Sequence, residues 1–500
     1  MRERTLAERA RDSAWVSQED GLAEQVAELE AAHGSRRLEL GQNAAALARP
    51  GIVPPARLAQ HVLAAGASRM LRTLTRFPGD LRSLVSGRNP QQLAMEAAVE
   101  AFADQLALSG PASAEVARII EGSGSLFPGV LRNELQRRHI RPLDLDPQTV
   151  EWIARRALGE IVLVGDEPIT AVPTSQLHAA DLPGGRPANV RVRRPGVARE
   201  LRADARFSGA LATAMSRIAP DQAGLGMGPV GFVELVARCG IEATDLELEA
   251  LNAIEIGLIL EEAGVERLSV ARPLPGHITE RAMASERLLG VPLHHYGGDL
   301  TDPGGLVAAL TSVTLEAALT HGTFWADPAP EHLLVLPGGR LAIVGLGTVG
   351  HFSPQLRRAG ITFLRSVLSG EFEGQVEAMR IAGAAPADLD VGGLVAEMQA
   401  AEALEVSRVM FGGEEGLLGA LNETVRIMLK YNLKPPVEVA LLLRTVFALG
   451  QLAERIDPEG GGLMAALMGL LPRLPDLLAD VSPDGESVDR RGEADTDEPS

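Results

Sequence analysis

Short strand-forming runs occur within long stretches of helical apolar spacing, and this mixture limits the fold more than any other feature of the sequence. Residues 160–164 form a short apolar run, and Ala188–Val192 alternates in the manner of a strand. The turn sequence Pro183-Gly-Gly-Arg186 lies between them. Aromatic residues make up only 3 % of the chain, so the surrounding helices must pack through Ala, Leu and Val. A helix-rich α+β protein with a small sheet is expected.

A helix rich in acids and a second pair of strands follow this first sheet. The acidic helix is expected over Glu242–Leu260. Further along, Leu333–Leu336 and Leu341–Val344 flank Pro337-Gly-Gly-Arg340, which predicts a β-hairpin. Helical spacing dominates from residue 355 to about 478. A small sheet, an acidic helix, a hairpin and then helices, in this order, indicate a protein-kinase-like fold with two lobes.

The same changes of pattern divide the chain into segments. Residues 480–500 hold eight acids and no aromatic residue, so this end is expected to be disordered. The expected segments are an N-terminal helical extension (1–95), a helical segment that packs on the N-lobe (96–150), a kinase-like N-lobe (151–290), a kinase-like C-lobe (291–400), C-terminal helices (401–478) and a disordered acidic tail (479–500).

Charge and composition limit the partners and the compartment. The formal net charge is −19, which argues against nucleic acid, because a phosphate backbone demands a basic surface. The one cysteine, Cys239, cannot form an intramolecular disulfide and indicates a reducing compartment. The first residues lack the apolar segment of a signal peptide. No run reaches the roughly 18–20 apolar residues that span a bilayer, and Gly460–Leu471 comes nearest. We expect a cytoplasmic protein, at most peripheral to a membrane.

A basic stretch in the N-terminal extension is the expected contact for a partner. Residues 36–88 carry nine arginines against two acids. A basic amphipathic helix over 57–76 would either lie on an anionic membrane surface or pack on the body of the protein with its arginines in solvent. A protein partner is also expected, whereas the sequence gives no indication of an oligomeric state.

The segment before the predicted hairpin carries the most specific motif. It reads His321-Gly-Thr-Phe-Trp-Ala-Asp-Pro-Ala-Pro-Glu-His332, and Gly345-Leu-Gly347 follows the hairpin. This order resembles the G-x-F-H-A-D-P-H-P-G-N, hairpin, D-F-G arrangement of the UbiB/AarF family of kinase-like proteins. The residues that match in register are Gly322, Phe324, Ala326, Asp327, Pro328 and Pro330.

Four further stretches resemble the same family in the same order. Residues 168–197 are similar to its P-I-A-A-A-S-x-x-Q-V-H and V-A-V-K-V-x-R-P-G-V motifs. Residues 245–252 are similar to D-x-x-x-E-A-x-N, 286–293 to E-x-x-x-G-x-P-L, and 434–444 to a pattern in the C-terminal helices. The resemblance covers roughly residues 105–460. It implies a kinase-like fold and a setting near membranes and isoprenoid or quinone lipids.

The resemblance also assigns the phosphoryl-transfer positions, and most of them are substituted. Kinases need a lysine on the phosphates paired with a glutamate, and two oxygen ligands for Mg²⁺. Arg191 stands at the lysine position and Glu249 at its partner; the two either contact phosphate or only hold the acidic helix against the sheet. His332 replaces the metal-binding Asn, and Gly345 replaces the D-F-G Asp. An imidazole is a poor ligand for Mg²⁺ and glycine offers none, so Mg-ATP chemistry is expected to fail.

The remaining family motifs point in the same direction. Asp327 keeps the position that orients the nucleophile, but without a metal its retention is interpreted as a hydrogen bond within the loop. Glu286 keeps the start of E-x-x-x-G-x-P-L. Glu115–Arg118 replaces the family's K-x-G-Q, and Pro173 removes a backbone donor from the expected nucleotide loop.

Three hypotheses about function follow. The leading one is a pseudokinase without confident catalytic residues, metal or cofactor, which acts as a scaffold or regulatory protein. The second is an ATPase or small-molecule kinase with a rearranged site, in which Glu331 supplies an oxygen ligand beside Asp327. The third is a small-molecule or peptide binder that uses the interlobe cleft without nucleotide. A side hypothesis lets Asp327, His332 and His351 converge on a softer ion such as Zn²⁺ or Mn²⁺.

Overall fold

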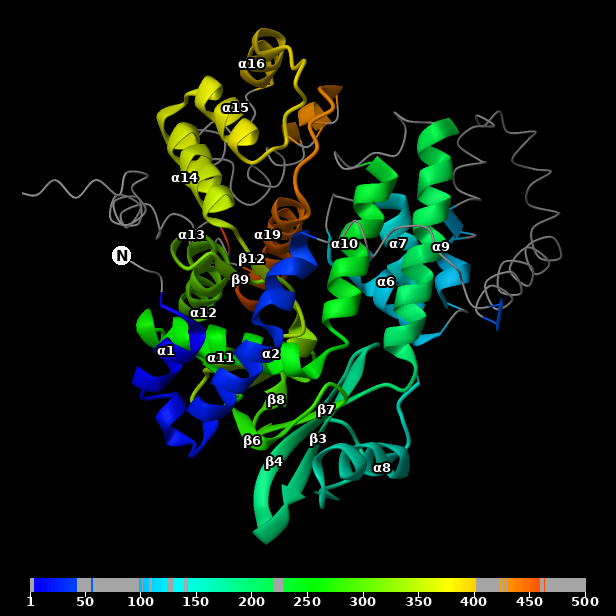
Figure 1. Ribbon diagram of the computed structural model, residues 1–500, viewed down its shortest axis with the longest axis vertical. Coiled ribbons are helices and arrows are strands. Elements are labelled where there is room, and N and C mark those ends of the chain that lie inside the picture. Colours follow the sequence, from blue (N-terminus) through cyan, green and yellow to red (C-terminus); the bar gives the residue numbers. More distant parts are fainter. Residues whose placement is uncertain are drawn as a thin grey trace, which may run out of the picture.

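The computed structural model is a helix-rich α+β fold, as the sequence predicts (Figure 1). One lobe, at the bottom of Figure 1, is built on a sheet, and most helices lie above it. The structure describes residues 4–42, 55–56, 99–100, 102–107, 110–123, 129–138, 140, 143–218, 228–401, 423–424, 426–428, 430–458 and 463. The basic stretch 57–76 and the acidic tail 479–500 lie outside these residues.

The N-lobe is a six-stranded antiparallel sheet in the order β1-β3-β4-β7-β6, with β2 paired to β3. Helix α8 (Pro147–Leu158) covers one face, because Val150, Ile153 and Ala154 pack against the buried residues of β4. The strands are β1 (Val162–Leu163), β2 (Thr170–Ala171), β3 (Ser175–Leu182), β4 (Arg186–Arg193), β6 (Pro273–Ile278) and β7 (Ala282–Glu286).

The first hairpin differs in one arm from the sequence prediction. The turn at 183–186 joins β3 to β4, whereas residues 160–164 contribute only the short edge strand β1. Strand β3 escapes the sequence pattern because Gln176 and His178 are buried on the side where an alternating strand would show apolar residues.

The C-lobe contains the second hairpin at the position predicted. Strands β10 (Leu333–Val335) and β11 (Leu341–Ile343) pair antiparallel, β5 (Leu268–Val270) runs parallel to β11, and β8 (Val291–Pro292) pairs with β10. Strands β9 (Thr323–Trp325) and β12 (Val349–His351) form a separate pair. The largest apolar cluster lies beneath these strands and joins α11 (Leu246–Glu262), α12 (Pro303–Thr311) and α19 (Val437–Ile456).

The N-terminal helices cover the outer face of the acidic helix α11 (Figure 1). They are α1 (Leu6–Asp12), the short η1 (Val16–Gln18) and α2 (Leu22–Gln42). Arg9 donates two hydrogen bonds of 3.0 Å to Glu262, and His33 Nε2 lies 2.7 Å from Glu247 Oε2. The acids on this side of α11 therefore bind the chain's own N-terminal segment.

The remaining helices surround the C-lobe. Helices α6 (Pro111–Glu121) and α7 (Gly129–Arg138) pack near α9 (Val197–Ile218), α10 (Gly228–Glu242) and the side of α19. Helices α14 (Pro354–Ser369), α15 (Phe372–Ile381) and α16 (Val391–Ala400) form the far end of the molecule (Figure 1). The short elements are η3 (Pro183–Gly185), η4 (Leu293–His295), the π-turn η5 (Ser312–Glu316), α13 (Ala317–Thr320) and η6 (Pro330–His332).

One described stretch meets the length and hydropathy of a membrane-spanning helix. Pro303–Thr320 has a mean hydropathy of 1.2 over 18 residues, and 56 % of it is buried inside the molecule. Leu306 and Leu310 pack in the main core. The expectation that no run reaches this length, with Gly460–Leu471 the nearest, was therefore wrong.

Candidate functional site

Arg191 and Glu249 meet inside the molecule, as expected from the lysine and glutamate positions they occupy. Arg191 Nε lies 3.2 Å from Glu249 Oε1, and both side chains are buried. The other nitrogens of Arg191 donate to Ser175 Oγ, at 3.0 Å, and to the carbonyl oxygen of Val344. Every nitrogen of the guanidinium therefore has a protein acceptor.

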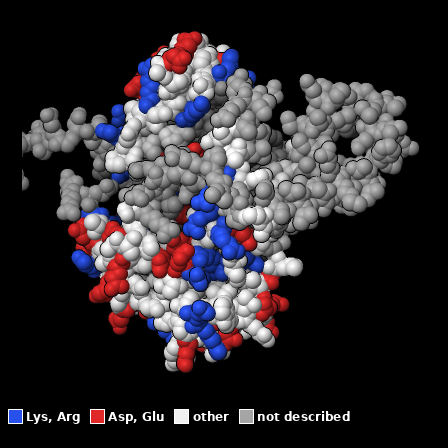
Figure 2. Space-filling model, turned by 45° about the vertical axis from the view of Figure 1, so that its right-hand side comes forward, with Lys and Arg blue, Asp and Glu red and all other residues white. Residues whose placement is uncertain are grey.

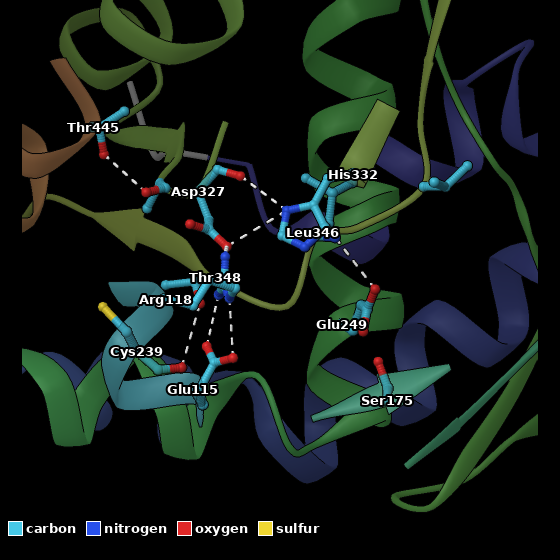
Figure 3. Close-up of polar contacts among 12 residues, drawn as sticks. Glu115, Arg118, Ser175, Cys239, Glu249, Asp327, His332, Leu346, Thr348 and Thr445 are labelled. Atoms are coloured by element: carbon cyan, nitrogen blue, oxygen red, sulfur yellow. Dashed lines mark hydrogen bonds and ion pairs between the residues drawn. The ribbon is translucent and has the colours of Figure 1, made fainter. Parts of the chain in front are cut away.

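Glu249 also holds the loop that follows the hairpin (Figure 3). The backbone N–H of Leu346 donates to Glu249 Oε1 at 3.2 Å, and Asn252 Nδ2 donates to the Leu346 carbonyl oxygen at 2.9 Å. This loop is the Gly345-Leu-Gly347 segment that stands at the D-F-G position. The ion pair and α11 thus fix the loop through its backbone.

Apolar side chains fill the space between the lobes beside this pair. Leu177 of β3 and Leu334 of β10 belong to one buried cluster that also includes Val344, with Ile169 and Leu288 packed against it. The cavity bounded by Arg191, Glu249 and this cluster's neighbours has a volume of about 20 Å³. That volume is on the scale of a single water molecule.

His332 occupies the volume that a side chain at position 345 would need. A Cβ placed on Gly345 would lie 2.4 Å from His332 Cδ2 and 2.6 Å from His332 Cγ. His332 is buried, and its Nδ1 lies 3.1 Å from the carbonyl oxygen of Asp327. The two positions that hold the metal in a kinase therefore contain one imidazole ring packed against one glycine.

Two arginines bind the carboxylate of Asp327, and Figure 3 shows the first of them, Arg118. Arg118 Nη1 donates to one oxygen at 2.7 Å, and Arg444 Nη2 donates to the other at 2.6 Å. Burial alone would raise the pKa of Asp327, but Arg118, Arg444 and then His332 lower the pKa far below its usual value. The carboxylate is a fixed anion, and both of its oxygens already accept charge-assisted hydrogen bonds.

These arginines connect the loop to two helices distant in sequence. Arg118 of α6 also donates to both oxygens of Glu115, at 3.0 and 2.6 Å. Burial lowers the pKa of Arg118, but Asp327 and Glu115 raise it well above its usual value. Arg444 of α19 donates to the Ala326 carbonyl oxygen at 2.8 Å and is only 1 % exposed. The carboxylate of Asp327 is therefore part of a buried ionic network with α6 and α19, whereas the sequence analysis expected a hydrogen bond within its own loop.

Arg194 binds the backbone of the expected nucleotide loop around Pro173. Arg194 is buried, and its Nε donates to the Val172 carbonyl oxygen at 3.1 Å. The backbone N–H of Arg194 donates to the Thr174 carbonyl oxygen at 2.9 Å. Pro173 lies between these two acceptors.

Glu286 and His351 lie in other clusters. Glu286 Oε1 accepts from the backbone N–H of Arg272 at 3.1 Å, and Arg272 stacks over the Trp15 ring at 5.3 Å. His351 Nε2 is 3.1 Å from Glu255 and 2.7 Å from Arg37 of α2. Among the described residues, no group of three His, Cys, Asp or Glu is arranged to hold a metal ion. The suggested convergence of His351 with Asp327 and His332 was wrong, because the partners of His351 are Arg37 and Glu255.

Sequence reasoning missed the roles of Arg118 and Arg444. Arg444 is the one charged residue in the apolar run Val439–Leu449 of α19. A lone charge at such a position predicts a buried partner, and that signal was present in the sequence. Arg118 was noted only as a replacement in K-x-G-Q, and its partner lies 209 residues away.

A cavity of about 330 Å³ lies on the side of Asp327 that faces α6, α7 and α19. Glu331 lines this cavity together with Asp327, whereas His332 and Gly345 do not. Glu331 is thus directed to a space different from the one where the metal ligands are lost.

Comparisons with known proteins agree with the motifs. Residues 163–379 match a family model described as the ABC1 atypical kinase-like domain. The chain is 23 % identical to an uncharacterized chloroplastic aarF domain-containing protein kinase of Arabidopsis thaliana, over 69 % of both chains. It is 24 % identical to a probable protein kinase UbiB of Xanthomonas campestris, over 70 % of this chain and 65 % of the relative. The chain therefore spans slightly less than two thirds of that relative.

A solved structure is similar over a large part of the chain. It is the complex of Rv3197 with erythromycin from Mycobacterium tuberculosis, with 18 % identity and a TM-score of 0.41. The match covers 70 % of this chain and 96 % of that one.

Proposed function

Because this chain belongs to the ABC1/UbiB (aarF) family of atypical kinase-like proteins, we propose that it is a pseudokinase member that binds no Mg-ATP productively and acts as a scaffold or regulatory protein. The observation that carries the proposal is the packing of His332 against Gly345. Mg²⁺ requires oxygen ligands in near-octahedral geometry, and this packing leaves neither an oxygen ligand nor room for one at position 345.

The contacts at the other positions of the family motifs support the same proposal. Arg191 is held by protein oxygens through all three of its nitrogens, so its guanidinium is fixed within the protein. Asp327 is a poor base, because its carboxylate is held by Arg118 and Arg444 and its pKa lies far below the usual value. In this proposal Arg191 and Asp327 stabilise the fold and do not take part in phosphoryl transfer.

The two alternatives receive less support. A rearranged ATPase that used Glu331 as a metal ligand would need this carboxylate near His332 and Gly345, but Glu331 lines the cavity on the α19 side of Asp327. A ligand in the interlobe cleft beside Arg191 would need more than about 20 Å³. Contact with a protein partner or an anionic membrane through the arginine-rich stretch 36–88, in the cytoplasm, stays part of the proposal.

The test is a nucleotide titration with and without Mg²⁺, read by the melting temperature of the full-length protein. A ligand at 100 times its Kd stabilises a protein by about 2.7 kcal/mol, which gives a melting shift well above the noise of the measurement. We expect no rise that depends on Mg²⁺ and ATP together. A saturable rise of this kind, with ATP turnover that Asp327→Ala abolishes, would overturn the proposal.

Two variants test the packing argument itself. Gly345→Asp alone should lower the melting temperature, because its side chain overlaps the His332 ring. Adding His332→Asn should recover most of the loss, because the smaller side chain frees the space. If Gly345→Asp melts at the wild-type temperature, the space is not filled as described, and the main argument against a metal ligand there fails.

A further inference from the structure

The cavity between Asp327, α6, α7 and α19 is large enough to be a ligand site. Its volume of about 330 Å³ lies within the range of roughly 300–1,000 Å³ that small-molecule pockets occupy. Pro328, Ala329 and Pro330 form one apolar wall, and Ala448 and Leu452 of α19 form another. Apolar walls with a few polar groups are typical of pockets that bind small molecules.

The cavity floor presents rigid hydrogen-bond donors. Arg118 and Arg444 both line it, and the carboxylate of Asp327 fixes both guanidinium groups. Arg444 Nε is buried and has no hydrogen-bond partner among the described residues. This atom is shielded from the cavity, so the more accessible guanidinium is that of Arg118, whose side chain is 17 % exposed.

The charges around the cavity do not favour a strongly anionic ligand. Three arginines line it, the third being Arg455 of α19, and three carboxylates line it as well, those of Glu121, Asp327 and Glu331. The charged groups of the lining are therefore equal in number. A phosphate or a dicarboxylate would meet no net attraction, in contrast to the arginine clusters that bind such groups.

Polar side chains at the rim can both donate and accept. Gln136 of α7 and Gln451 of α19 face the cavity from two walls, and each has an amide N–H and a carbonyl oxygen. Glu331 accepts but does not donate. A ligand that matches this lining has oxygen acceptors for the arginines and O–H or N–H donors for the carboxylates and amides. It carries little charge of its own.

We propose that this cavity binds a small uncharged molecule rich in hydroxyl or amide groups, without metal or phosphate. The site goes beyond the proposed pseudokinase function, because none of its contacts involves Arg191, His332 or Gly345. A positive nucleotide titration would overturn the pseudokinase proposal and leave this one standing. Failure of the cavity to bind a ligand would overturn this proposal and leave the pseudokinase proposal standing.

The single cysteine makes a direct test possible. Cys239 is buried, and burial raises the pKa of its thiol to about 11, so it does not compete for disulfide exchange. Gln451→Cys places a reactive thiol at the cavity rim. Arg380→Cys, on α15, gives a matched exposed thiol outside the cavity.

Both variants are equilibrated with cysteamine disulfides that carry a glucose, a lactamide, a succinate or a phosphate group, in a series of reductant concentrations. Intact-mass spectrometry measures the fraction labelled. At Gln451→Cys we expect the glucose or lactamide adduct to withstand about tenfold more reductant than at Arg380→Cys, and the succinate and phosphate adducts to show no such gain.

Either of two results would overturn the proposal. The first is equal resistance of all four adducts at both positions, which means that the cavity contributes no binding. The second is preference for succinate or phosphate at Gln451→Cys, which means that the arginines rather than the carboxylates dominate the site. Circular dichroism of both variants shows whether the fold is retained, and Gln136→Cys on the opposite wall replaces Gln451→Cys if it is not.

Discussion

Asp327→Asn separates a structural role of this carboxylate from a catalytic one. In an enzyme that used Asp327 to orient a nucleophile, the amide would abolish turnover and leave the fold nearly unchanged. In this structure the carboxylate accepts from Arg118 at 2.7 Å and from Arg444 at 2.6 Å, inside the protein. We therefore expect the variant to lose stability.

The magnitude follows from the burial of the three charges. Removing one partner of a buried ion pair costs about 3–5 kcal/mol, because it leaves an uncompensated charge. Arg118 retains Glu115, and an asparagine oxygen still accepts one hydrogen bond, so the lower end, about 3 kcal/mol, applies here.

The loss also depends on pH, and its sign follows from the lowered pKa. The folded state holds the pKa of Asp327 far below its usual value, so ionisation stabilises the fold. This contribution is complete above the pKa of the unfolded carboxyl, about 3.9, and disappears as the pH falls towards the folded pKa. The gap between wild type and Asp327→Asn should be constant from pH 5 to 8 and narrow below about pH 4.

The assay is urea unfolding followed by circular dichroism, at pH 7 and at pH 3.5. Asp166→Asn, at an exposed turn of the N-lobe, is the control and should change the free energy of unfolding by no more than about 0.5 kcal/mol. The reasoning is refuted if Asp327→Asn unfolds at the same urea concentration as the control, or if the gap widens at low pH.

Two further predictions concern buried positions outside this network. Cys239 should resist Ellman's reagent at pH 8 in the folded protein and react fully in urea, since its thiol is buried and its pKa is raised to about 11; prompt labelling of the folded chain would contradict this. Gly257→Ala should destabilise the protein by about 1–3 kcal/mol, because the new Cβ would lie 2.6 Å from the ring of Trp15. Urea unfolding of Gly257→Ala in a Trp15→Leu background checks the cause, and a loss as large as in the wild-type background would show that the ring is not responsible.

The parts of the fold that the sequence predicted are those with local patterns. The hairpin around residues 337–340 and the acidic helix α11 have turn residues or acids within a few positions of one another. Strand β3 was missed because both of its faces are buried, and buried Gln176 and His178 break the alternation. The N-terminal helices were recognised as helices, but their contact with α11 joins residues more than 200 positions apart.

In the candidate site, too, the sequence predicted what local motifs encode and missed the contacts between residues distant in the chain. Sequence comparison with family motifs identified Arg191, Glu249 and Asp327, and the structure adds the partners that motifs do not encode. Arg444 is an example, because its ion pair with Asp327 spans 117 residues. The predicted hairpin brings His332 close to position 345, because its register pairs Leu333 with Ile343. The overlap itself depends on the orientation of the His332 ring, which the sequence pattern does not encode.

The fit of His332 against Gly345 also limits which substitutions these two positions accept one at a time. An aspartate introduced first at position 345 meets an imidazole in the same space. An asparagine introduced first at position 332 leaves an unfilled hollow beside a glycine, at a cost in stability. The two positions are therefore coupled, and a change at either one alone gives a less stable protein.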